Sequence, residues 1–158
     1  MNQNQFHLAQ ANVARMRAPL EDPSMEEFSA NIAAINALAE STPGFVWRFQ
    51  TEEGDATAVR PFDDEKILFN MSVWTSSEAL FEYTYKTEHV RFLARRKEWF
   101  THQEGPSLVL WWIPVGHIPT IEEALDRFSE LEKNGPSPSA FSFGQQFSLE
   151  GLPFKSAR

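Results

Sequence analysis

Two stretches of this chain are apolar on both faces of the strands that they are expected to form. Residues 67–74, ILFNMSVW, place Ile, Phe, Met and Val on one side and Leu and Trp on the other, and residues 108–113, LVLWWI, are apolar throughout. A strand in an antiparallel sheet with one wet face would alternate apolar and polar residues instead. We therefore expect both faces of the sheet to be covered. Either a second copy of the chain, in a two-fold dimer, or the long C-terminal tail can cover the second face.

The order of the expected elements indicates the fold class. Three helices are predicted to begin at capping boxes, in which a Ser or Thr is followed three residues later by Glu, at residues 24–27, 75–78 and 120–123. A further helical segment is predicted over residues 89–100. Strands are predicted at residues 6–14, 45–50, 67–74 and 108–113. The resulting order, β-α-β-β-α-β with an added helix and an extended tail, predicts an α+β fold of the ferredoxin-like split βαβ type. Such a fold has an antiparallel sheet with helices on one face.

The composition limits the class of protein. At 158 residues, 42% of them hydrophobic and 23% charged, the chain is expected to form one domain over residues 1–150, with a frayed tail at 151–158. Cysteine is absent, which excludes disulfides and thiolate chemistry and is compatible with the cytoplasm. No secretory signal is visible, and no apolar run is long enough to span a membrane. A net charge of −8 argues against nucleic acid as a partner. We therefore expect a cytoplasmic protein that binds neither nucleic acid nor membrane.

The segment from residue 86 to residue 97 is locally cationic in an otherwise acidic chain. At about 100° per residue, His89 and Arg96 fall on the apolar arc of the expected helix with Tyr85, whereas Arg95 projects to its edge or beyond. A buried cation is costly unless it is paired or faces a polar cavity. Two interpretations follow. Either Arg96 pairs with a core carboxylate while His89 caps a carbonyl, or both residues face an anionic or carbonyl-bearing ligand.

Several strand residues carry polar side chains among apolar neighbours. Arg48 shares a strand face with Val46, and Asn70 and Ser72 share one with Trp74. Such groups either line a cavity or bond loop backbone, and the sequence leaves both interpretations open. The four histidines show no metal-ligand spacing, and neither a glycine-rich phosphate loop nor a Gly-x-Ser-x-Gly step occurs. We therefore expect no metal site, and expect any activity to proceed without a metal, flavin or nicotinamide cofactor.

The region from Asn70 to Leu80, NMSVWTSSEAL, followed by Thr87-Glu-His89, resembles the signature region of the dimeric α/β-barrel superfamily. The resemblance is to its antibiotic-biosynthesis-monooxygenase-like proteins in particular. A wider pattern includes Glu98-Trp-Phe100, the run LWWIPVGHIPT at 110–120, a Gly-Pro-Ser step and a Phe-Ser-Phe tail. This pattern resembles a functionally uncharacterised bacterial family of the same superfamily, over nearly the whole chain.

The resemblance implies a homodimer with two sheets packed back to back and a pocket between sheet and helices. In cofactor-independent members an Asn and a Trp four residues apart handle a phenolic substrate and dioxygen, and Asn70 and Trp74 match those positions. Haem-degrading relatives use a His late in the equivalent helix. His89 comes earlier than that position, and Ala94 stands nearer to it.

Three functions are compatible with these features. The first is a cofactor-independent monooxygenase-like enzyme acting on a hydrophobic aromatic or polyketide-like molecule, with Asn70, Trp74 and His89 as catalytic residues. Its predicted substrate-binding residues are Arg96, Tyr85, Arg48, Ser72 and Trp112. The second is a haem-binding protein that uses His89 as an axial ligand. The third is a non-catalytic dimer that binds a small molecule.

Overall fold

A computed structural model describes residues 5–49, 66–87, 89–101 and 105–154 of the chain. Its centre is one antiparallel sheet, in which β1 (Phe6–Met16) lies between β3 (Ile67–Trp74) on one edge and β4 (Phe100–Thr101) and β5 (Leu108–Pro114) on the other. The edge strand β2 (Phe45–Arg48) pairs with β3. The order β2-β3-β1-β5, with antiparallel neighbours, is that of the ferredoxin-like split βαβ arrangement. The predicted α+β class is therefore confirmed. Gln50, where the second strand was predicted to end, lies outside the described residues.

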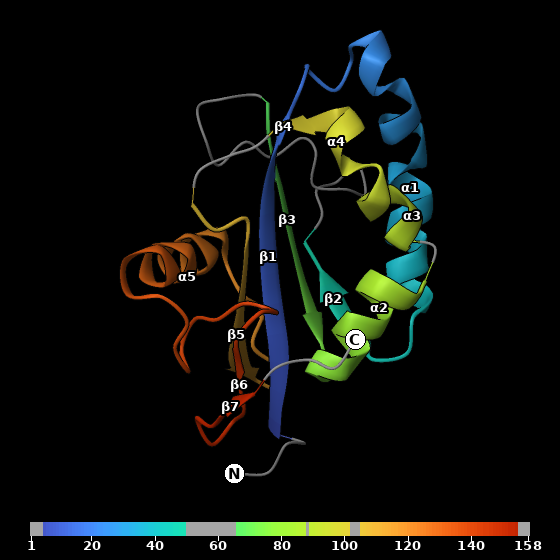
Figure 1. Cartoon of the computed structure of the whole chain (residues 1–158). Coiled ribbons are helices and arrows are strands. Elements are labelled where there is room, and N and C mark those ends of the chain that lie inside the picture. Colours follow the sequence, from blue (N-terminus) through green and yellow to red (C-terminus); the bar gives the residue numbers. More distant parts are fainter. Residues whose placement is uncertain (1–4, 50–65, 88, 102–104, 155–158) are drawn as a thin grey trace.

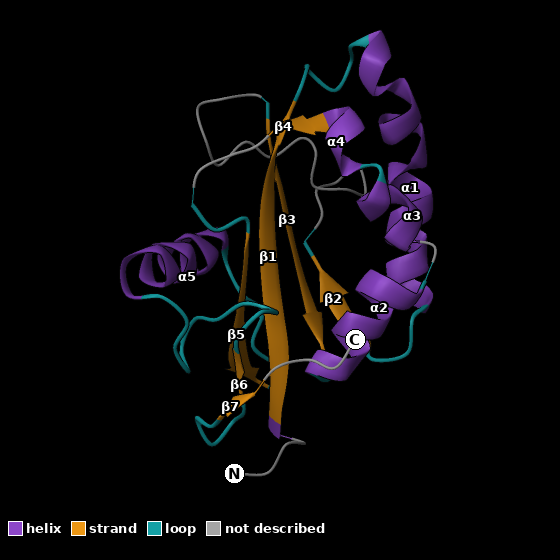
Figure 2. Cartoon of the chain, viewed as in Figure 1, coloured by secondary structure: helices purple, strands orange, loops and turns teal. Residues whose placement is uncertain are grey.

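Helices cover both faces of the sheet, so that the molecule has three layers (Figures 1 and 2). One layer is formed by α1 (Glu26–Ser41), α2 (Ser77–Lys86), α3 (His89–Ala94) and α4 (Arg96–Trp99). The other layer is α5 (Ile121–Asn134), which lies across the opposite face of the sheet. The expectation that the helices share one face is therefore wrong for α5.

The sheet face that packs against α5 is apolar in all three central strands. None of its buried residues is more than 8% exposed: Ala9, Ala11, Val13, Phe69, Met71, Val73, Val109, Trp111 and Ile113. From α5, Ala124 and Leu131 are buried in the same cluster, and Ile121 and Phe128 pack against it. The second face is thus covered by the chain's own helix α5, and the tail contributes Ala140 to the same cluster. A second copy is not required to bury these strands, and the homodimer stays a prediction.

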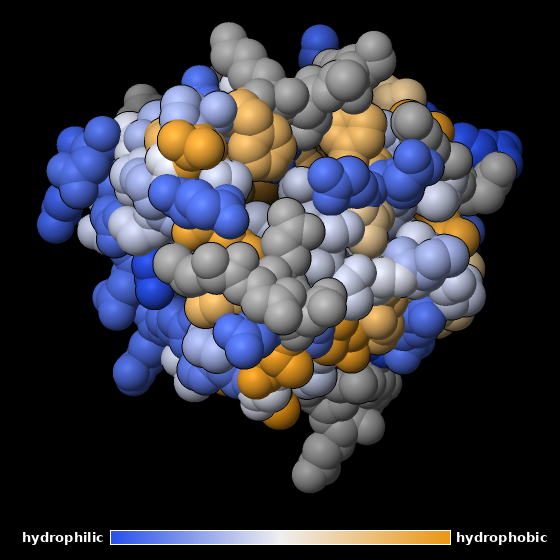
Figure 3. Space-filling view, turned by 90° about the horizontal axis from the view of Figure 1, so that it is seen from below, coloured by the Kyte–Doolittle hydropathy of each residue, from blue (hydrophilic) through white to orange (hydrophobic). Residues whose placement is uncertain are grey.

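The C-terminal tail caps the edge of β5. Phe141 exchanges two backbone hydrogen bonds with Leu110, with N–O distances of 2.8 and 2.9 Å, and it is buried in the same cluster as Trp74 on the face opposite α5. Further along, β6 (Gln146–Phe147) and β7 (Pro153–Phe154) pair with each other. The first part of the segment predicted to be frayed therefore forms a turn and a strand, whereas residues 155–158 lie outside the described residues. From the end where β1 begins, apolar side chains on the described surface are scattered among polar ones (Figure 3).

Local capping chemistry explains where the helices begin. Thr120 Oγ1 accepts a hydrogen bond from the Glu123 amide at 3.1 Å, as its capping box predicts. At α2 the predicted cap, Thr75, is wrong by one residue, because Ser76 is the cap and accepts from the Ala79 amide at 3.1 Å. The capping box predicted at Ser24 is wrong, because the chain first forms the 3-10 turn η2 (Pro23–Met25), capped by Asp22, and α1 begins only after it.

Candidate functional site

A stripe of polar side chains crosses the sheet on the face opposite α5. In the register of the sheet, Ser72 of β3 lies opposite Gln10 of β1 and also opposite Arg48 of β2. Two residues further along the same two strands, Asn70 lies opposite Asn12. Residues directly opposite one another in an antiparallel sheet project to the same face. We call these five residues the polar stripe: Gln10, Asn12, Arg48, Asn70 and Ser72.

The polar stripe runs from the surface into the core under the helical layer. Asn70 is exposed and Asn12 is half-buried, whereas Gln10 is 4% and Ser72 7% exposed. Beyond Ser72 on the same face, Trp74 is completely buried in a cluster with residues of α1 and α2. A ligand that reaches this face would therefore meet Asn70 first. Trp74 lies behind the polar stripe, where it supports the site and offers no contact surface.

A directed chain of hydrogen bonds links the polar stripe to Trp74. Asn12 Nδ2 donates to Gln10 Oε1 at 2.9 Å, and Gln10 Nε2 donates to Ser72 Oγ at 2.7 Å. Trp74 Nε1 donates to the same Ser72 oxygen at 2.8 Å. The Ser72 hydroxyl oxygen thus accepts two hydrogen bonds from buried donors, which holds it in one position.

Stacked rings continue this connection into α2 and the start of α3. The ring of Tyr83 stacks on Trp74 with centroids 5.1 Å apart, and the ring of His89 lies 4.8 Å from that of Tyr83. Burial raises the pKa of the Tyr83 hydroxyl well above its ordinary value of 10, although the charge of Arg48 opposes this shift. Tyr83 is therefore a neutral phenol at every physiological pH. The rings join His89 to the polar stripe through a continuous set of contacts.

His89 is held in one tautomer. Its Nδ1 lies 3.1 Å from the carbonyl oxygen of Thr84, and because a carbonyl can only accept, Nδ1 carries the proton. Burial lowers the pKa of His89, against the opposing effect of this hydrogen bond. The ring is therefore neutral near pH 7, with a lone pair on Nε2. A neutral imidazole in this state can act as a proton acceptor or as a metal ligand.

Arg48 reaches the stripe because β2 is irregular. Phe45 pairs with Trp74 but Trp47 pairs with Val73, so the register shifts between them. A bulge of this kind changes which residues face each side. As a result Arg48 faces the helical layer, where its guanidinium Nε lies 3.7 Å from Glu40 Oε2. The prediction that Arg48 shares a strand face with Val46 assumed a regular strand, and the register shift breaks that regularity. Arg48 does lie beside Ser72.

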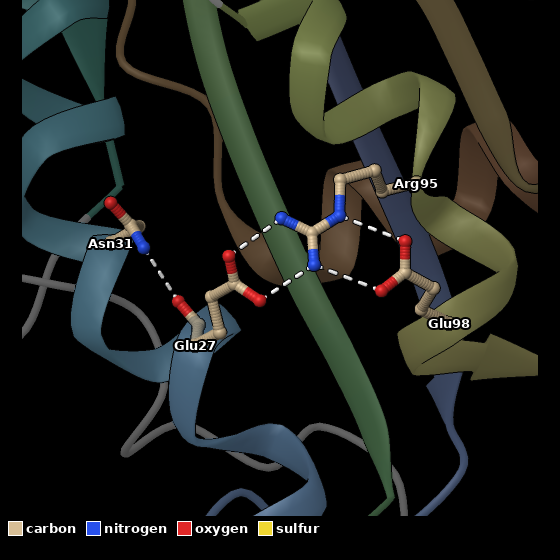
Figure 4. Close-up of polar contacts among 4 residues, drawn as sticks. All are labelled: Glu27, Asn31, Arg95 and Glu98. Atoms are coloured by element: carbon tan, nitrogen blue, oxygen red, sulfur yellow. Dashed lines mark hydrogen bonds and ion pairs between the residues drawn. The ribbon is translucent and has the colours of Figure 1, made fainter.

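The structure does not bring Arg96 to this site. The helical segment predicted over residues 89–100 is interrupted at Arg95, and Arg96 is exposed at the start of α4. The inner-arc position derived for Arg96 is therefore wrong. Arg95 is the engaged cation: its guanidinium hydrogen-bonds both carboxylate oxygens of Glu27 at 2.7 and 2.6 Å and those of Glu98 at 2.8 and 2.9 Å (Figure 4). It also lies over the Trp99 ring, 4.7 Å from its centroid. These contacts tie the start of α4 to α1 at the point where the helical segment is interrupted.

Tyr85 and Trp112 lie at the far end of the same face, beside the C-terminal tail. The ring of Tyr85 packs against Phe81 and Phe143, with centroids 4.8 and 5.8 Å apart. Trp112 Nε1 donates to the Phe147 carbonyl at 2.9 Å. Tyr85 thus helps to attach the tail to the helical layer, and Trp112 attaches it to the sheet.

Gln10, Asn12 and Tyr83 are members of the site that were not singled out from the sequence. A signal for the first two was present, because Gln10 and Asn12 follow Leu8 at even spacing on one strand face. Their meaning depends on the register with β3, which the sequence does not reveal. Tyr83 shows no distinguishing pattern, since aromatic residues on a helix are typical of a core.

Among the described residues there is no group of three or more His, Asp or Glu side chains that could hold a metal ion. No helix in the same residues is long and apolar enough to cross a membrane.

The fold and the site define an α+β protein with a ferredoxin-like sheet and a partly buried polar stripe beneath its helices. The chain belongs to the family described as "Domain of unknown function (DUF3291)", whose model matches residues 7–156. This agrees with the resemblance to an uncharacterised family seen in the sequence. A comparison with curated proteins finds no match.

Several solved structures are similar to the chain at low sequence identity. SnoaB, a cofactor-independent oxygenase from Streptomyces nogalater, is 16% identical with a TM-score of 0.45, over 73% of this chain and 96% of that one. NE2512, a protein of unknown function from Nitrosomonas europaea, is 9% identical with a TM-score of 0.46, over 74% and 96%. PA3566 from Pseudomonas aeruginosa is 14% identical with a TM-score of 0.44, over 75% and 100%. Similarities of this size assign neither an activity nor a residue role.

Proposed function

We propose that the chain is a cofactor-independent oxygenase that acts on a hydrophobic aromatic or polyketide-like molecule bound against the polar stripe. The observation that carries this proposal is the polar stripe itself, which leads from exposed Asn70 to buried Ser72 across a face otherwise made of aromatic and aliphatic side chains. A small number of placed polar groups in apolar surroundings suits a ligand that is largely apolar and carries one or two oxygens.

A reaction of this class needs no cofactor because the substrate supplies the electrons. A methylene group beside a carbonyl or phenol loses a proton, and the resulting enolate or phenolate reacts with dioxygen. One oxygen atom becomes a carbonyl on the substrate, and the other leaves as water with the two methylene hydrogens, so that CH2 and O2 give C=O and H2O. The protein has to accept a proton and to stabilise the developing negative charge in dry surroundings.

The described residues offer both functions. His89, neutral and with its lone pair on Nε2, accepts the proton. The Asn70 amide, at the open end of the polar stripe, donates to the enolate oxygen. Trp74 acts as a positioning residue through its hydrogen bond to Ser72, since it is completely buried. Arg96 has no part in this scheme, because it is exposed on α4.

The first test is oxygen consumption with dithranol, other anthrones and phenols, in metal-free buffer containing a chelator. The Asn70→Ala variant should turn over at least about tenfold more slowly, a barrier change of about 1.4 kcal/mol, while its thermal midpoint stays unchanged because Asn70 is exposed. Asn134→Ala, at the end of α5, is the matched control. Absence of turnover with every substrate, or an equal effect of the two variants, would contradict the proposal and favour a non-catalytic binding protein.

Haem binding is the second candidate, and the tautomer of His89 favours it. A ligating histidine usually donates its other ring N–H to a carbonyl or carboxylate, as His89 does to Thr84. The experiment is a visible spectrum of the purified protein after addition of haem. A Soret band that shifts on binding and disappears in His89→Ala would support this candidate, and the free-haem spectrum would exclude it.

The predicted partner, a second copy of the chain, remains part of this proposal. Although α5 covers the central strands, Trp47, Phe49 and Ile67 at the β2 side of the same face are only partly buried. A second copy packing on these residues would remove the remaining apolar surface from water. Sedimentation velocity at micromolar concentration is the measurement, and a monomer there would contradict the prediction.

A further inference from the structure

Thr87 joins the end of α2 to the start of α3 through its side-chain hydroxyl. Its Oγ1 donates to the Tyr83 carbonyl at 2.5 Å and accepts from the His89 amide at 3.3 Å. A carbonyl can only accept a hydrogen bond and a backbone N–H can only donate one, so neither contact can run in the opposite direction. The Thr87 carbonyl also accepts from the Val90 amide at 3.1 Å. Thr87 is therefore fixed to both helices, and His89 is the first residue of the second one.

The imidazole of His89 is fixed to the same turn of α2. The last carbonyls of a helix have no partner within the helix and need one from outside it. The Tyr83 carbonyl takes the Thr87 hydroxyl, and the next carbonyl, that of Thr84, lies 3.1 Å from His89 Nδ1. The His89 ring also packs against the Tyr83 ring, with centroids 4.8 Å apart. The backbone of His89 and its side chain thus have separate anchors on one helix end.

The side-chain anchor decides which ring nitrogen of His89 carries the proton. The hydrogen bond that a histidine ring makes to its surroundings sets its tautomer. The Thr84 carbonyl requires an N–H at Nδ1, which leaves the lone pair on Nε2. Such a bond weakens steeply when its angle departs from linearity. It therefore depends on where the His89 backbone is placed, and the Thr87 hydroxyl holds that backbone.

We infer that Thr87 is a positioning residue for His89, and that its hydroxyl keeps the His89 proton on Nδ1 and the lone pair on Nε2. The inference rests on the proposed function for the use of that lone pair as a proton acceptor. The tautomer itself is a property of the protein without substrate. Haem ligation would need the same lone pair, so the role of Thr87 is common to both candidate functions.

The test measures the tautomer of His89 from proton–nitrogen NMR correlation spectra at pH 8, above the ordinary pKa of histidine. The signals that disappear in His89→Gln identify the ring, and the wild-type ring should carry its proton on Nδ1. Thr87→Val suits the extended backbone at this position but lacks the hydroxyl. It should shift the tautomer ratio toward Nε2–H by about fivefold, the usual effect of one hydrogen bond.

Two further substitutions at Thr87 separate the hydroxyl from the shape of the side chain. Thr87→Ser keeps the hydroxyl and loses only the methyl group, so it should restore the wild-type tautomer ratio. Thr87→Ala removes the hydroxyl without adding a branched apolar chain, so it should give the same shift as Thr87→Val. The alanine variant also provides the comparison if the valine variant does not fold.

Thr42→Val is the matched control. Thr42 ends α1 as Thr87 ends α2, and its Oγ1 donates to the Leu38 carbonyl four residues earlier, at 2.7 Å. Both threonines are half-buried, but Thr42 is followed by Pro43 and Gly44 and not by a histidine. The control loses the same kind of hydrogen bond at a helix end, so it should lower the thermal midpoint similarly and leave the His89 tautomer unchanged.

Three results would overturn the inference: a wild-type ring protonated on Nε2, an unchanged tautomer in the variants without the hydroxyl, or an equal shift in Thr42→Val. These results are distinguishable from failure of the proposed function, which is judged by oxygen consumption. A protein whose His89 tautomer depends on Thr87 but which consumes no oxygen would keep the positioning role and lose the oxygenase assignment.

Discussion

The two faces of the sheet are made by the same strands, yet they are built on different principles. In the described part of the central strands, the residues buried toward α5 are all apolar, and Trp111 Nε1 donates to Glu123 Oε2 of α5 at 2.8 Å. Burial opposes the ionised form of Glu123, but hydrogen bonds from His117 and Trp111 outweigh it and lower the pKa of this carboxyl. The opposite face keeps Gln10 and Ser72 in its interior. One face is thus optimised for packing, and the other accepts buried polar groups that packing alone would not favour.

The largest expected difference between the faces is in stability. Trp111→Ala removes a completely buried ring from the α5 face and should lower the free energy of unfolding by about 3–5 kcal/mol. Urea denaturation measures this loss. If Trp111→Ala costs no more than Ser72→Ala, the two faces are equally tolerant and the contrast between them is wrong.

A smaller effect is expected within the polar stripe. Ser72→Ala deletes few atoms, but it leaves the Gln10 and Trp74 donors without their acceptor and should cost about 1–3 kcal/mol in the free energy of unfolding. Ser72→Thr keeps the acceptor and should cost less. Denaturation of the two variants side by side separates the hydrogen bonds from the volume change, and equal losses would show that packing at this position dominates.

The smallest effect concerns pH. Burial lowers the pKa of His89 below its ordinary value of 6.5, so the unfolded chain binds a proton more readily than the folded one. The stability that depends on neutral His89 is complete above pH 6.5 and is lost as the pH falls below it. Unfolding free energies measured from pH 7.5 to pH 5 should decline less steeply in His89→Gln, which has no titratable ring. An identical slope in the variant would contradict the lowered pKa.

The sequence predicts the elements well where the pattern is local. The strand over residues 67–74 has the predicted bounds, and the cap at Thr120 is the predicted one, because period-two alternation and capping chemistry involve only neighbouring residues. The side of the sheet on which α5 lies was not predictable in this way. An amphipathic helix shows which of its own faces is buried, but not which face of a doubly apolar sheet it covers.

The candidate site depends on contacts between distant residues, and there the sequence was less informative. Arg95 is held by Glu27, which lies 68 residues away in the sequence. The helix is interrupted at Arg95, and the inward position predicted for Arg96 assumed one continuous helix. Gln10 and Ser72 lie 62 residues apart, and only the register of β1 with β3 makes them partners. The shift within β2, which turns Arg48 toward Ser72, is likewise a property of the paired strands.

The attachment of the tail to β5 has a consequence for the solution behaviour of the chain. A sheet edge with free amide and carbonyl groups attracts strands from other molecules, and an apolar edge strand is the most hazardous kind. Phe141 forms hydrogen bonds with both the amide and the carbonyl of Leu110 in β5. The tail just before it is held by Arg127 of α5, which donates to the Ser139 carbonyl at 2.7 Å. The tail therefore shields a run of Leu, Val and Trp residues from strand addition, and a chain shortened before Ala140 should form amyloid-like aggregates at concentrations where the intact chain does not.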